Sequence, residues 1–272
     1  LLPRPDSRPC IPCGNEKKGR GGWSGVVSIF FLAKRKEEDV TDNRRVVIVG
    51  LGGIGSWLVQ GLAPFLNFSS EFSWTLVLVD GDEYEEKNKA RQAFDELGPK
   101  AEVQTSWVAR RYPRLQVRSV TQYLSFDGCE DTLPISEAIR SGDIVFSCVD
   151  NHKTRKMLSD HCANLRDAAL ISGGNEYTDG NVQVFVRVGG QDKTCRLDKY
   201  HPELASPRDK APFEMSCEEL AASSPQLIFA NLTAATLMLN AFYALEQKKL
   251  DWQKSEVYFD IVANAATPRV RK

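Results

Sequence analysis

A glycine-rich turn followed by an acidic residue is the first feature of the sequence that could carry chemistry. Gly50-Leu-Gly52-Gly53-Ile-Gly55 comes directly after the apolar run 46–49, and Asp80 ends the next apolar run. Glycines in such a turn let the backbone approach a phosphate, and the free N–H groups at the start of the following helix attract an anion. An acid at the end of the second run can accept hydrogen bonds from ribose hydroxyls. These residues predict a binding site for an adenine nucleotide, either NAD or ATP.

Polar residues after Asp80 favour ATP over a nicotinamide cofactor. Asn88, Arg91 and Lys100 add an amide and two cations. A dinucleotide carries only a diphosphate, whereas such a cluster suits a triphosphate whose charge grows as pyrophosphate leaves. Asp150, after a later apolar run, could hold Mg²⁺, which usually takes one or two carboxylates together with phosphate oxygens. The pattern Gly-x-x-x-x-Gly-Lys-Ser/Thr is absent from the sequence, so a P-loop ATPase is excluded.

The elements that must position these residues alternate between strands and helices. We expect strands over 45–50, 74–80, 115–120, 143–148 and 168–172, and helices over 54–63, 99–112 and 152–165. This alternation, with continuous apolar runs, predicts a parallel sheet with helices on both faces. We expect an antiparallel strand over 181–188, a loop over 189–216, a helix over 225–245 and a closing strand over 257–262. The fold class is therefore α/β: a Rossmann-like, mostly parallel sheet flanked by helices, with an antiparallel C-terminal extension of the sheet.

Composition and charge exclude several classes of protein. The 272 residues carry 35 lysines and arginines against 36 aspartates and glutamates. Such a balance does not suit a dedicated nucleic-acid binder, so no nucleic-acid partner is expected. Residues 1–45 hold ten basic against six acidic residues, which indicates a tail that is disordered or not native. No apolar run approaches the roughly 18 residues of a membrane span. We therefore expect no membrane partner and a cytoplasmic location.

Five motifs in register make the sequence resemble the ThiF/MoeB/HesA family, the bacterial relatives of ubiquitin-activating enzymes. The motifs are Gly50-Leu-Gly-Gly-Ile-Gly55, Val79-Asp-Gly-Asp82 with Asn88 and Arg91-Gln92, Gly98-Pro-Lys100-Ala, Cys148-Val-Asp150-Asn151, and Ser172-Gly-Gly174 followed by Gly180-Asn-Val-Gln-Val-Phe185. One such motif is a weak signal, whereas five in this order and spacing are a strong one. The resemblance implies one ThiF-like ATP-binding adenylyltransferase domain over residues 46–272.

The resemblance also implies a reaction and roles for the matching residues. Members of the family bind ATP·Mg²⁺ and the C-terminal Gly carboxylate of a ubiquitin-like or sulfur-carrier protein. That carboxylate attacks the α-phosphate and gives an acyl-adenylate and pyrophosphate. A homodimer is implied as well. By this resemblance Asp80 holds the ribose and Asp150 binds Mg²⁺. The phosphates are held by Arg91, Lys100 and Asn88. The nucleotide site also includes Gly50, Gly52, Gly53, Gly55 and the carboxylate of Asp82, and it is supported by Gln92 and Asn151.

Cysteines raise two separate questions, a covalent intermediate and a zinc site. Cys217 stands where many family members carry the cysteine that takes up the activated acyl group, and it reads equally well as an unreactive loop cysteine. MoeB-like proteins often carry two Cys-x-x-Cys pairs in the C-terminal half, whereas Cys195 stands alone here. The pair Cys10-Ile-Pro-Cys13 has no partner pair at the usual spacing. We therefore expect no structural zinc.

Two alternative functions remain open at this point. The glycine turn and Asp80 also fit an NAD-dependent Rossmann oxidoreductase, although no acid/base residue for hydride transfer can be nominated. A non-catalytic nucleotide-binding scaffold is the second alternative. The presence of Arg91, Lys100 and Asp150 together counts against the scaffold, because nothing there would require all three.

Overall fold

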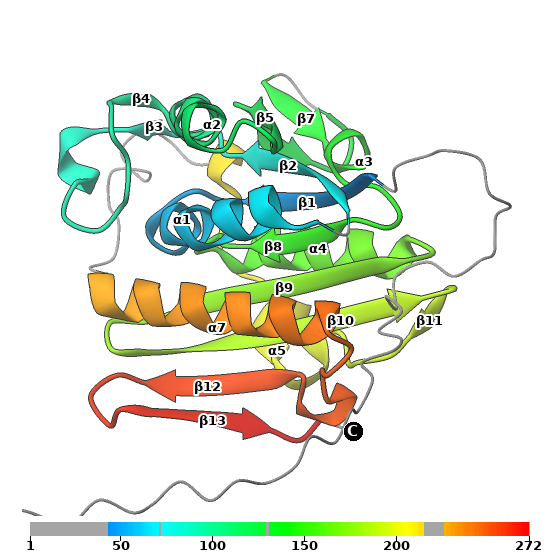
Figure 1. The fold of residues 1–272 in the computed structure, drawn as a ribbon. Helices are drawn as coiled ribbons and strands as arrows, with labels where there is room; N and C mark the ends of the chain where they lie inside the picture. The colour runs from blue at the N-terminus through cyan, green and yellow to red at the C-terminus, as the bar shows by residue number, and fades with distance from the viewer. Residues whose placement is uncertain (1–42, 71, 129–130, 215–225, 272) are drawn as a thin grey trace, which may run out of the picture.

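A central sheet organises the computed structural model, which describes residues 43–70, 72–128, 131–214 and 226–271 (Figure 1). Its strands are in the order β13-β12-β10-β9-β8-β1-β2-β5, with β11 paired to β10. The parallel strands are β1 (Asn43–Val49), β2 (Ser73–Val79), β5 (Gln116–Val120), β8 (Ile144–Ser147) and β9 (Ala168–Asn175). The antiparallel strands are β10 (Asp179–Val188), β11 (Gln191–Asp192), β12 (Glu256–Asp260) and β13 (Ala265–Arg269). The predicted fold class is confirmed.

Helices cover both faces of this sheet. On one face lie α1 (Gly53–Phe68), α2 (Lys100–Arg111) and α7 (Ile228–Glu246), and α1 packs against α7. On the other face lie α3 (Ile135–Ala138), α4 (His152–Asn164) and α5 (Pro202–Ala205). Figure 1 shows α1 and α7 in front of the sheet and α4 behind it. The sheet is therefore the middle layer of three.

Strand β1 shows why this sheet is buried on both sides. Val46 and Ile48 point into the core beneath α1 and α7, whereas Val47 and Val49 point into the core beneath α4. Side chains alternate between the faces of a strand, so a strand with two buried faces needs a continuous apolar run. Burying one such side chain contributes about 1.5–3 kcal/mol to folding.

Short elements account for most differences from the predicted pattern. Strand β13 follows β12, so the prediction that the strand at 257–262 closes the fold is wrong. The predicted loop 189–216 contains β11, α5 and two short 3₁₀ helices, η2 (Leu197–Tyr200) and η3 (Pro212–Glu214). Two small ladders, β3–β4 (Glu83–Tyr84 with Gly98–Pro99) and β6–β7 (Tyr123–Ser125 with Thr132–Pro134), lie outside the main sheet.

Helix α7 corrects one sequence-based expectation. By length and apolarity alone it could cross a membrane, contrary to the prediction that no segment approaches a span. Core helices of folded domains pass the same test. In the structure Ala230, Ala234, Met238 and Phe242 of this helix are buried in the core that it shares with α1 and the sheet.

The strand order identifies where a ligand would bind. The chain runs from β1 outward to β2 and β5, and then crosses to β8 on the opposite side of β1. Ligands of open α/β sheets bind beyond the carboxyl ends of the strands at such a switch point. Here that point lies between Gly50, after β1, and Cys148, after β8.

Candidate functional site

The glycine turn forms one wall of the switch point, and two of its glycines are required by close contacts. Gly50 has a φ of +88°, and a Cβ there would lie 2.9 Å from the carbonyl of Cys148. A Cβ at Gly55 would lie 1.9 Å from the Gly50 carbonyl oxygen. Gly52 differs, because its Cβ position meets no described atom within 4 Å. The turn is therefore tight on the protein side and open beside Gly52, where α1 begins.

Asp80 ties this turn to the end of β2. Its Oδ2 accepts a hydrogen bond from the Leu51 N–H at 2.5 Å, and its Oδ1 accepts one from the Asp82 N–H at 2.8 Å. Burial raises the pKa of the Asp80 carboxyl to about 6, although the nearby Lys100 opposes this rise. A carboxylate has room for further acceptor contacts, so Asp80 can also receive a ribose hydroxyl.

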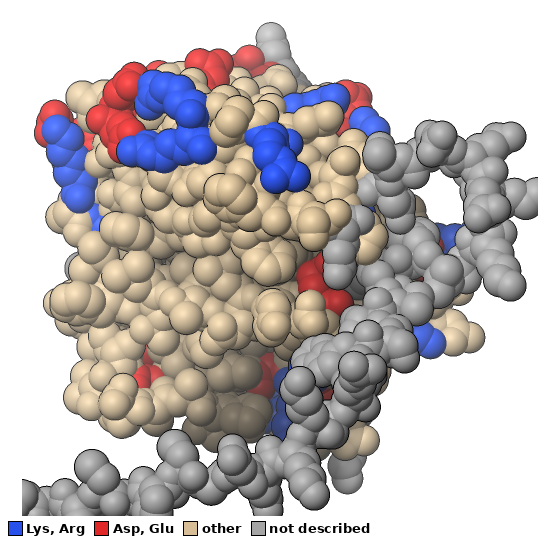
Figure 2. All heavy atoms as spheres, viewed as in Figure 1, with Lys and Arg blue, Asp and Glu red and all other residues tan. Residues whose placement is uncertain are grey.

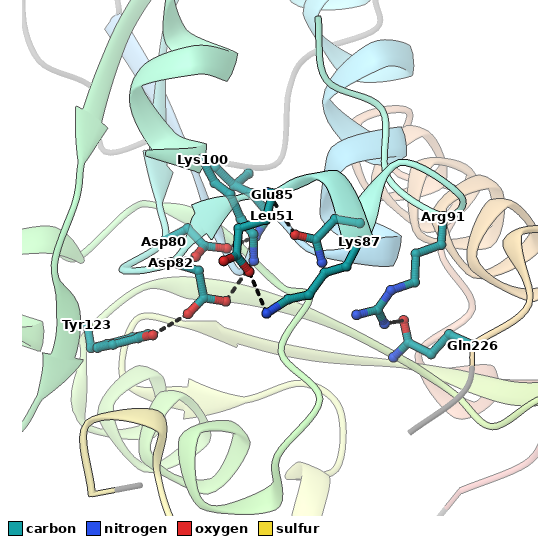
Figure 3. Close-up of polar contacts among 10 residues, drawn as sticks. Leu51, Asp80, Asp82, Glu85, Lys87, Arg91, Lys100, Tyr123 and Gln226 are labelled. Atoms are coloured by element: carbon teal, nitrogen blue, oxygen red, sulfur yellow. Dashed lines mark hydrogen bonds and ion pairs between the residues drawn. The ribbon is translucent and has the colours of Figure 1, made fainter. Parts of the chain in front are cut away.

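Lys100 brings a buried positive charge to the same place (Figure 3). It begins α2, and its Nζ lies 2.7 Å from Oδ2 of Asp82. Burial alone would lower the pKa of Lys100, but the carboxylates of Asp80 and Asp82 raise it above its ordinary value. For Asp82, burial alone would raise the pKa, but Lys100 lowers it below its ordinary value. Both partners are therefore charged at neutral pH.

The segment that follows β3 places the other predicted phosphate ligands. Asn88 ends the 3₁₀ helix η1 (Glu86–Asn88), and its Oδ1 accepts a hydrogen bond from the Glu85 N–H at 3.0 Å. Arg91 donates from Nη1 to Oε1 of Gln226 at 3.1 Å, so it already contacts the residue two positions before α7 (Figure 3). Gln92 is buried, and its Oε1 has no hydrogen-bond partner among the described residues.

Asp150 and Asn151 occupy the loop between β8 and α4, and they do different things. Asp150 is exposed. Burial is the largest influence on the pKa values of Lys100 and Tyr123, and the negative charge of Asp150 adds a smaller upward influence to both. The charge of Asp150 therefore acts on the buried cation, although the two groups form no ion pair in the described part of the chain. Asn151 instead caps α4, because its Oδ1 accepts the Thr154 N–H at 2.8 Å.

An exposed carboxylate at the switch point of the sheet suits Mg²⁺. This ion is usually held by one or two carboxylates plus phosphate oxygens and water, and it seldom has a site made only of protein groups. Asp150 supplies the carboxylate. No group of three or more His, Cys, Asp or Glu side chains that could hold a metal is found among the described residues. The donor set thus fits a metal that arrives with phosphates.

The cysteines fall into two groups. Cys217 lies outside the described residues, as do Cys10, Cys13 and Cys129. Cys148 and Cys162 are buried free thiols, and burial raises the pKa of each to about 12, so they are unreactive filling of the core. Cys195 is half-buried.

Sequence reasoning missed Tyr123 and Arg155. The Tyr123 hydroxyl donates a hydrogen bond to Oδ1 of Asp82, and a Cβ at Gly81 would lie 2.8 Å from its ring. Tyr123 lies on the three-residue strand β6, which has no sequence period that could have marked it. Arg155 on α4 bonds to backbone carbonyls, a role that no motif announces.

Comparisons with known proteins give a consistent picture. The model of the ThiF family matches residues 28–257. Curated relatives include the adenylyltransferase and sulfurtransferase MOCS3 of Drosophila ananassae, which is 31% identical over 157 residues, 56% of this chain and 32% of the relative. The SAMP-activating enzyme E1 of Haloferax volcanii is 34% identical over 149 residues, 53% of this chain and 50% of the relative. The chain thus spans between a third and a half of the length of these relatives.

Solved structures agree on the fold. E. coli MccB with succinimide has a TM-score of 0.61 at 18% identity, over 84% of this chain and 63% of that one. E. coli MccB with ATP has a TM-score of 0.58 at 18% identity, over 85% of this chain and 64% of that one. At such identities the likeness concerns the fold alone.

Proposed function

Because the chain belongs to the ThiF family, we propose that it is an adenylyltransferase acting on the C-terminal glycine of a ubiquitin-like or sulfur-carrier protein. The observation that carries this proposal is the buried, charged Lys100, which is paired with Asp82 and lies within the electrostatic influence of Asp80 and Asp150. A cation in that place suits the leaving pyrophosphate of ATP. Hydride transfer from a nicotinamide has no use for it, and a scaffold would not need to keep it.

The proposed reaction needs no general base. A carboxylate oxygen of the terminal glycine attacks the α-phosphorus of ATP, a new O–P bond forms, and the bond from that phosphorus to the β-phosphate oxygen breaks. The products are an acyl-adenylate and pyrophosphate. Since the nucleophile is already ionised, alignment and charge neutralisation carry the step. ATP–pyrophosphate exchange, which runs this step in both directions, tests the proposal.

The chain's residues divide this work. Asp80 accepts the ribose hydroxyls, and the start of α1 beside Gly52 receives a phosphate. When ATP binds, the Nζ of Lys100 moves from Asp82 to the phosphates. Arg91 likewise leaves Gln226 and binds the phosphates. Asn88 and Gln92 line the phosphate end of the site. Asp150 would hold Mg²⁺, which adds positive charge against the phosphates when it is bound.

Adenosine binding should depend on pH through Asp80. With a pKa of about 6, this carboxyl is mostly ionised at pH 7 and mostly protonated at pH 5. Only the ionised form keeps all its acceptor positions for ribose, so adenosine should bind about tenfold more weakly at pH 5 than at pH 7. Calorimetric titration with adenosine measures this without a titrating phosphate. Asp80→Asn should remove the pH step, and a pH-independent affinity in the unchanged protein would contradict the assignment.

The proposed enzyme is a homodimer that forms through the outer face of α1 and α7. This face is defined by the exposed rings of Phe65, Phe68, Phe229 and Tyr243. No charged residue occurs in α1, and α7 has only Glu246, which is bound to Arg44. Figure 2 shows few blue or red atoms over these helices. Such a face can meet its own copy across a two-fold axis without opposing like charges.

A single charge on this face should break the dimer. Phe68→Glu places a carboxylate opposite an apolar surface of the second copy, so the dimer dissociation constant should rise more than tenfold. Light scattering over a dilution series measures it. Phe126→Glu, at another exposed phenylalanine, is the matched control and should leave the dimer intact. A monomeric unchanged protein, or an undisturbed Phe68→Glu dimer, would overturn the assignment.

Two further proposals go with this function. Cys217 takes the acyl group from the adenylate as a thioester and releases AMP. We expect Cys217→Ala to leave exchange unchanged and to remove any acid-stable, thiol-sensitive adduct with the partner on a non-reducing gel; an adduct that survives would exclude the role. A cytoplasmic location suits both ATP and the free thiols of Cys148 and Cys162.

A further inference from the structure

The loop that carries Asp150 is held by a guanidinium that the proposed reaction does not use. Arg155, in the second turn of α4, donates two hydrogen bonds to the Val149 carbonyl, from Nε at 3.1 Å and from Nη2 at 2.7 Å. The same Nη2 lies 2.9 Å from the Gly173 carbonyl oxygen. No ion pair of Arg155 with a carboxylate is found in the described part of the chain. Its hydrogen bonds therefore go to two backbone carbonyls, while Asp150 and Asp209 attract its charge from beyond ion-pair distance.

These two carbonyls lie where the parallel ladder stops. The last residues paired between β8 and β9 are Ser147 and Ser172. Beyond that pair, β8 turns into the loop that leads to α4, whereas β9 continues beside β10. Arg155 joins Val149 of the one segment to Gly173 of the other. It therefore replaces the backbone hydrogen bonds that are missing where β8 and β9 separate.

The double glycine of the Ser172-Gly-Gly174 motif fits this arrangement. A Cβ at Gly174 would lie 2.6 Å from both terminal nitrogens of Arg155, so any side chain there would displace the guanidinium from its present position. A Cβ at Gly173 would lie 2.2 Å from the sulfur of Met238 on α7. Neighbouring residues of a strand face opposite sides, so the two glycines admit the side chains of two helices on the two faces of the sheet.

Asp150 depends on its backbone for orientation. Its side chain is exposed, and no hydrogen bond to its carboxylate is found among the described residues. On the β1 side the loop is fixed by the Cys148 N–H, which donates to the Val49 carbonyl at 2.8 Å. On the β9 side it is fixed by Arg155 through Val149. Val149, whose carbonyl accepts the hydrogen bonds of Arg155, directly precedes Asp150. Replacing Arg155 therefore releases the peptide group that orients the Asp150 carboxylate.

We propose that Arg155 is a positioning residue that aims Asp150 at the metal–nucleotide complex by clamping the carbonyls of Val149 and Gly173. The inference rests on the proposed function, because Asp150 matters there as the metal-holding carboxylate. It predicts a selective defect. Arg155→Gln should lose the tightening that Mg²⁺ gives to nucleotide binding and should keep the binding that Asp80 and the glycine turn provide.

The test is calorimetric titration with a non-hydrolysable ATP analogue, with and without Mg²⁺, and with adenosine. For Arg155→Gln we expect the Mg²⁺-dependent gain in affinity to fall about tenfold, while adenosine and metal-free affinities stay within about twofold. Arg155→Lys should restore part of the gain, since one ammonium reaches one carbonyl. Lys156→Gln, the next residue along α4, whose ammonium pairs with Asp160, is the matched control and should behave like the unchanged protein.

A double-mutant cycle distinguishes positioning from a general structural role. If Arg155 acts through Asp150, Arg155→Gln should cause no further loss of the Mg²⁺ effect once Asp150→Asn is present. Equal, additive losses in all three titrations would overturn the proposal, as would an unchanged Mg²⁺ effect in Arg155→Gln. Should Arg155→Gln fail to fold, Gly174→Ala displaces the guanidinium and must produce the same selective loss. A wild-type protein without any Mg²⁺ effect on binding would instead count against the proposed function itself.

Discussion

Replacing Lys100 with methionine is expected to slow adenylation about 10²–10³-fold, the range observed when one preorganised charge-stabilising group is removed from an active site. Methionine keeps most of the buried side-chain volume and removes the charge. The effect should be large because Lys100 is buried beside Asp80 and Asp82, where no solvent cation can substitute for it. The initial rate of ATP–pyrophosphate exchange with the cognate partner measures this loss.

Lys100→Met should also weaken the fold, and this has to be measured separately. The Asp82 carboxylate would lose its partner at 2.7 Å but would keep the Tyr123 hydroxyl and its access to solvent, so we expect a cost of about 1 kcal/mol of unfolding free energy. Circular dichroism shows what fraction is folded at the assay temperature. Lys89→Met, at an exposed lysine that pairs with Glu86, is the matched control and should change the rate less than about twofold. A folded Lys100→Met protein with a normal rate would contradict the assignment.

Replacing Asp150 with asparagine should abolish most activity without affecting the fold, whereas Lys100→Met should affect both. The side chain is exposed, so its charge contributes little to stability. Asparagine keeps the shape and removes the charge that would hold Mg²⁺, so we expect exchange to fall at least about 10²-fold. Higher Mg²⁺ concentrations should restore part of the rate, because the metal's affinity has been weakened.

The melting temperature of Asp150→Asn should match that of the unchanged protein, and this separates it from Lys100→Met. Asp160→Asn, near the opposite end of α4 and paired with Lys156, is the matched control and should keep full activity. If Asp150→Asn kept normal exchange at limiting Mg²⁺, the carboxylate would have no role in metal binding, and another group would have to hold the metal.

The sequence predicted the sheet because its strands follow simple rules. Short, β-branched apolar runs such as 46–49 that end at a glycine are typical of strands buried on both faces, and each predicted parallel strand is present. The strand ends then locate Asp80 and Asp150 at one edge without any structure. Strand β13 was not predicted, because its residues are exposed and apolar residues do not alternate with polar ones in Ala265–Arg269.

Contacts between distant segments were beyond sequence reasoning. Lys100 was predicted as a phosphate ligand, but its ion pair with Asp82 depends on how α2 packs. The hydrogen bond from the Tyr123 hydroxyl to the same carboxylate depends on how β6 packs. Asn151 was predicted to support the nucleotide site, and the hydrogen bond from the Thr154 N–H to its side-chain Oδ1, which caps α4, depends on local geometry that the sequence does not show. The clamp made by Arg155 could not be predicted, because it acts through backbone carbonyls that every residue has.

ATP–pyrophosphate exchange with purified Gly-Gly-ended partners tests the central claim most directly. The protein, ATP·Mg²⁺ and the correct partner should incorporate labelled pyrophosphate into ATP, with no incorporation when the partner's terminal glycine is removed. The first step alone produces this signal, so it does not depend on Cys217 or on the later fate of the acyl group. A folded protein that binds ATP and yet exchanges no pyrophosphate with any ubiquitin-like or sulfur-carrier partner would contradict the account and favour a nucleotide-binding scaffold.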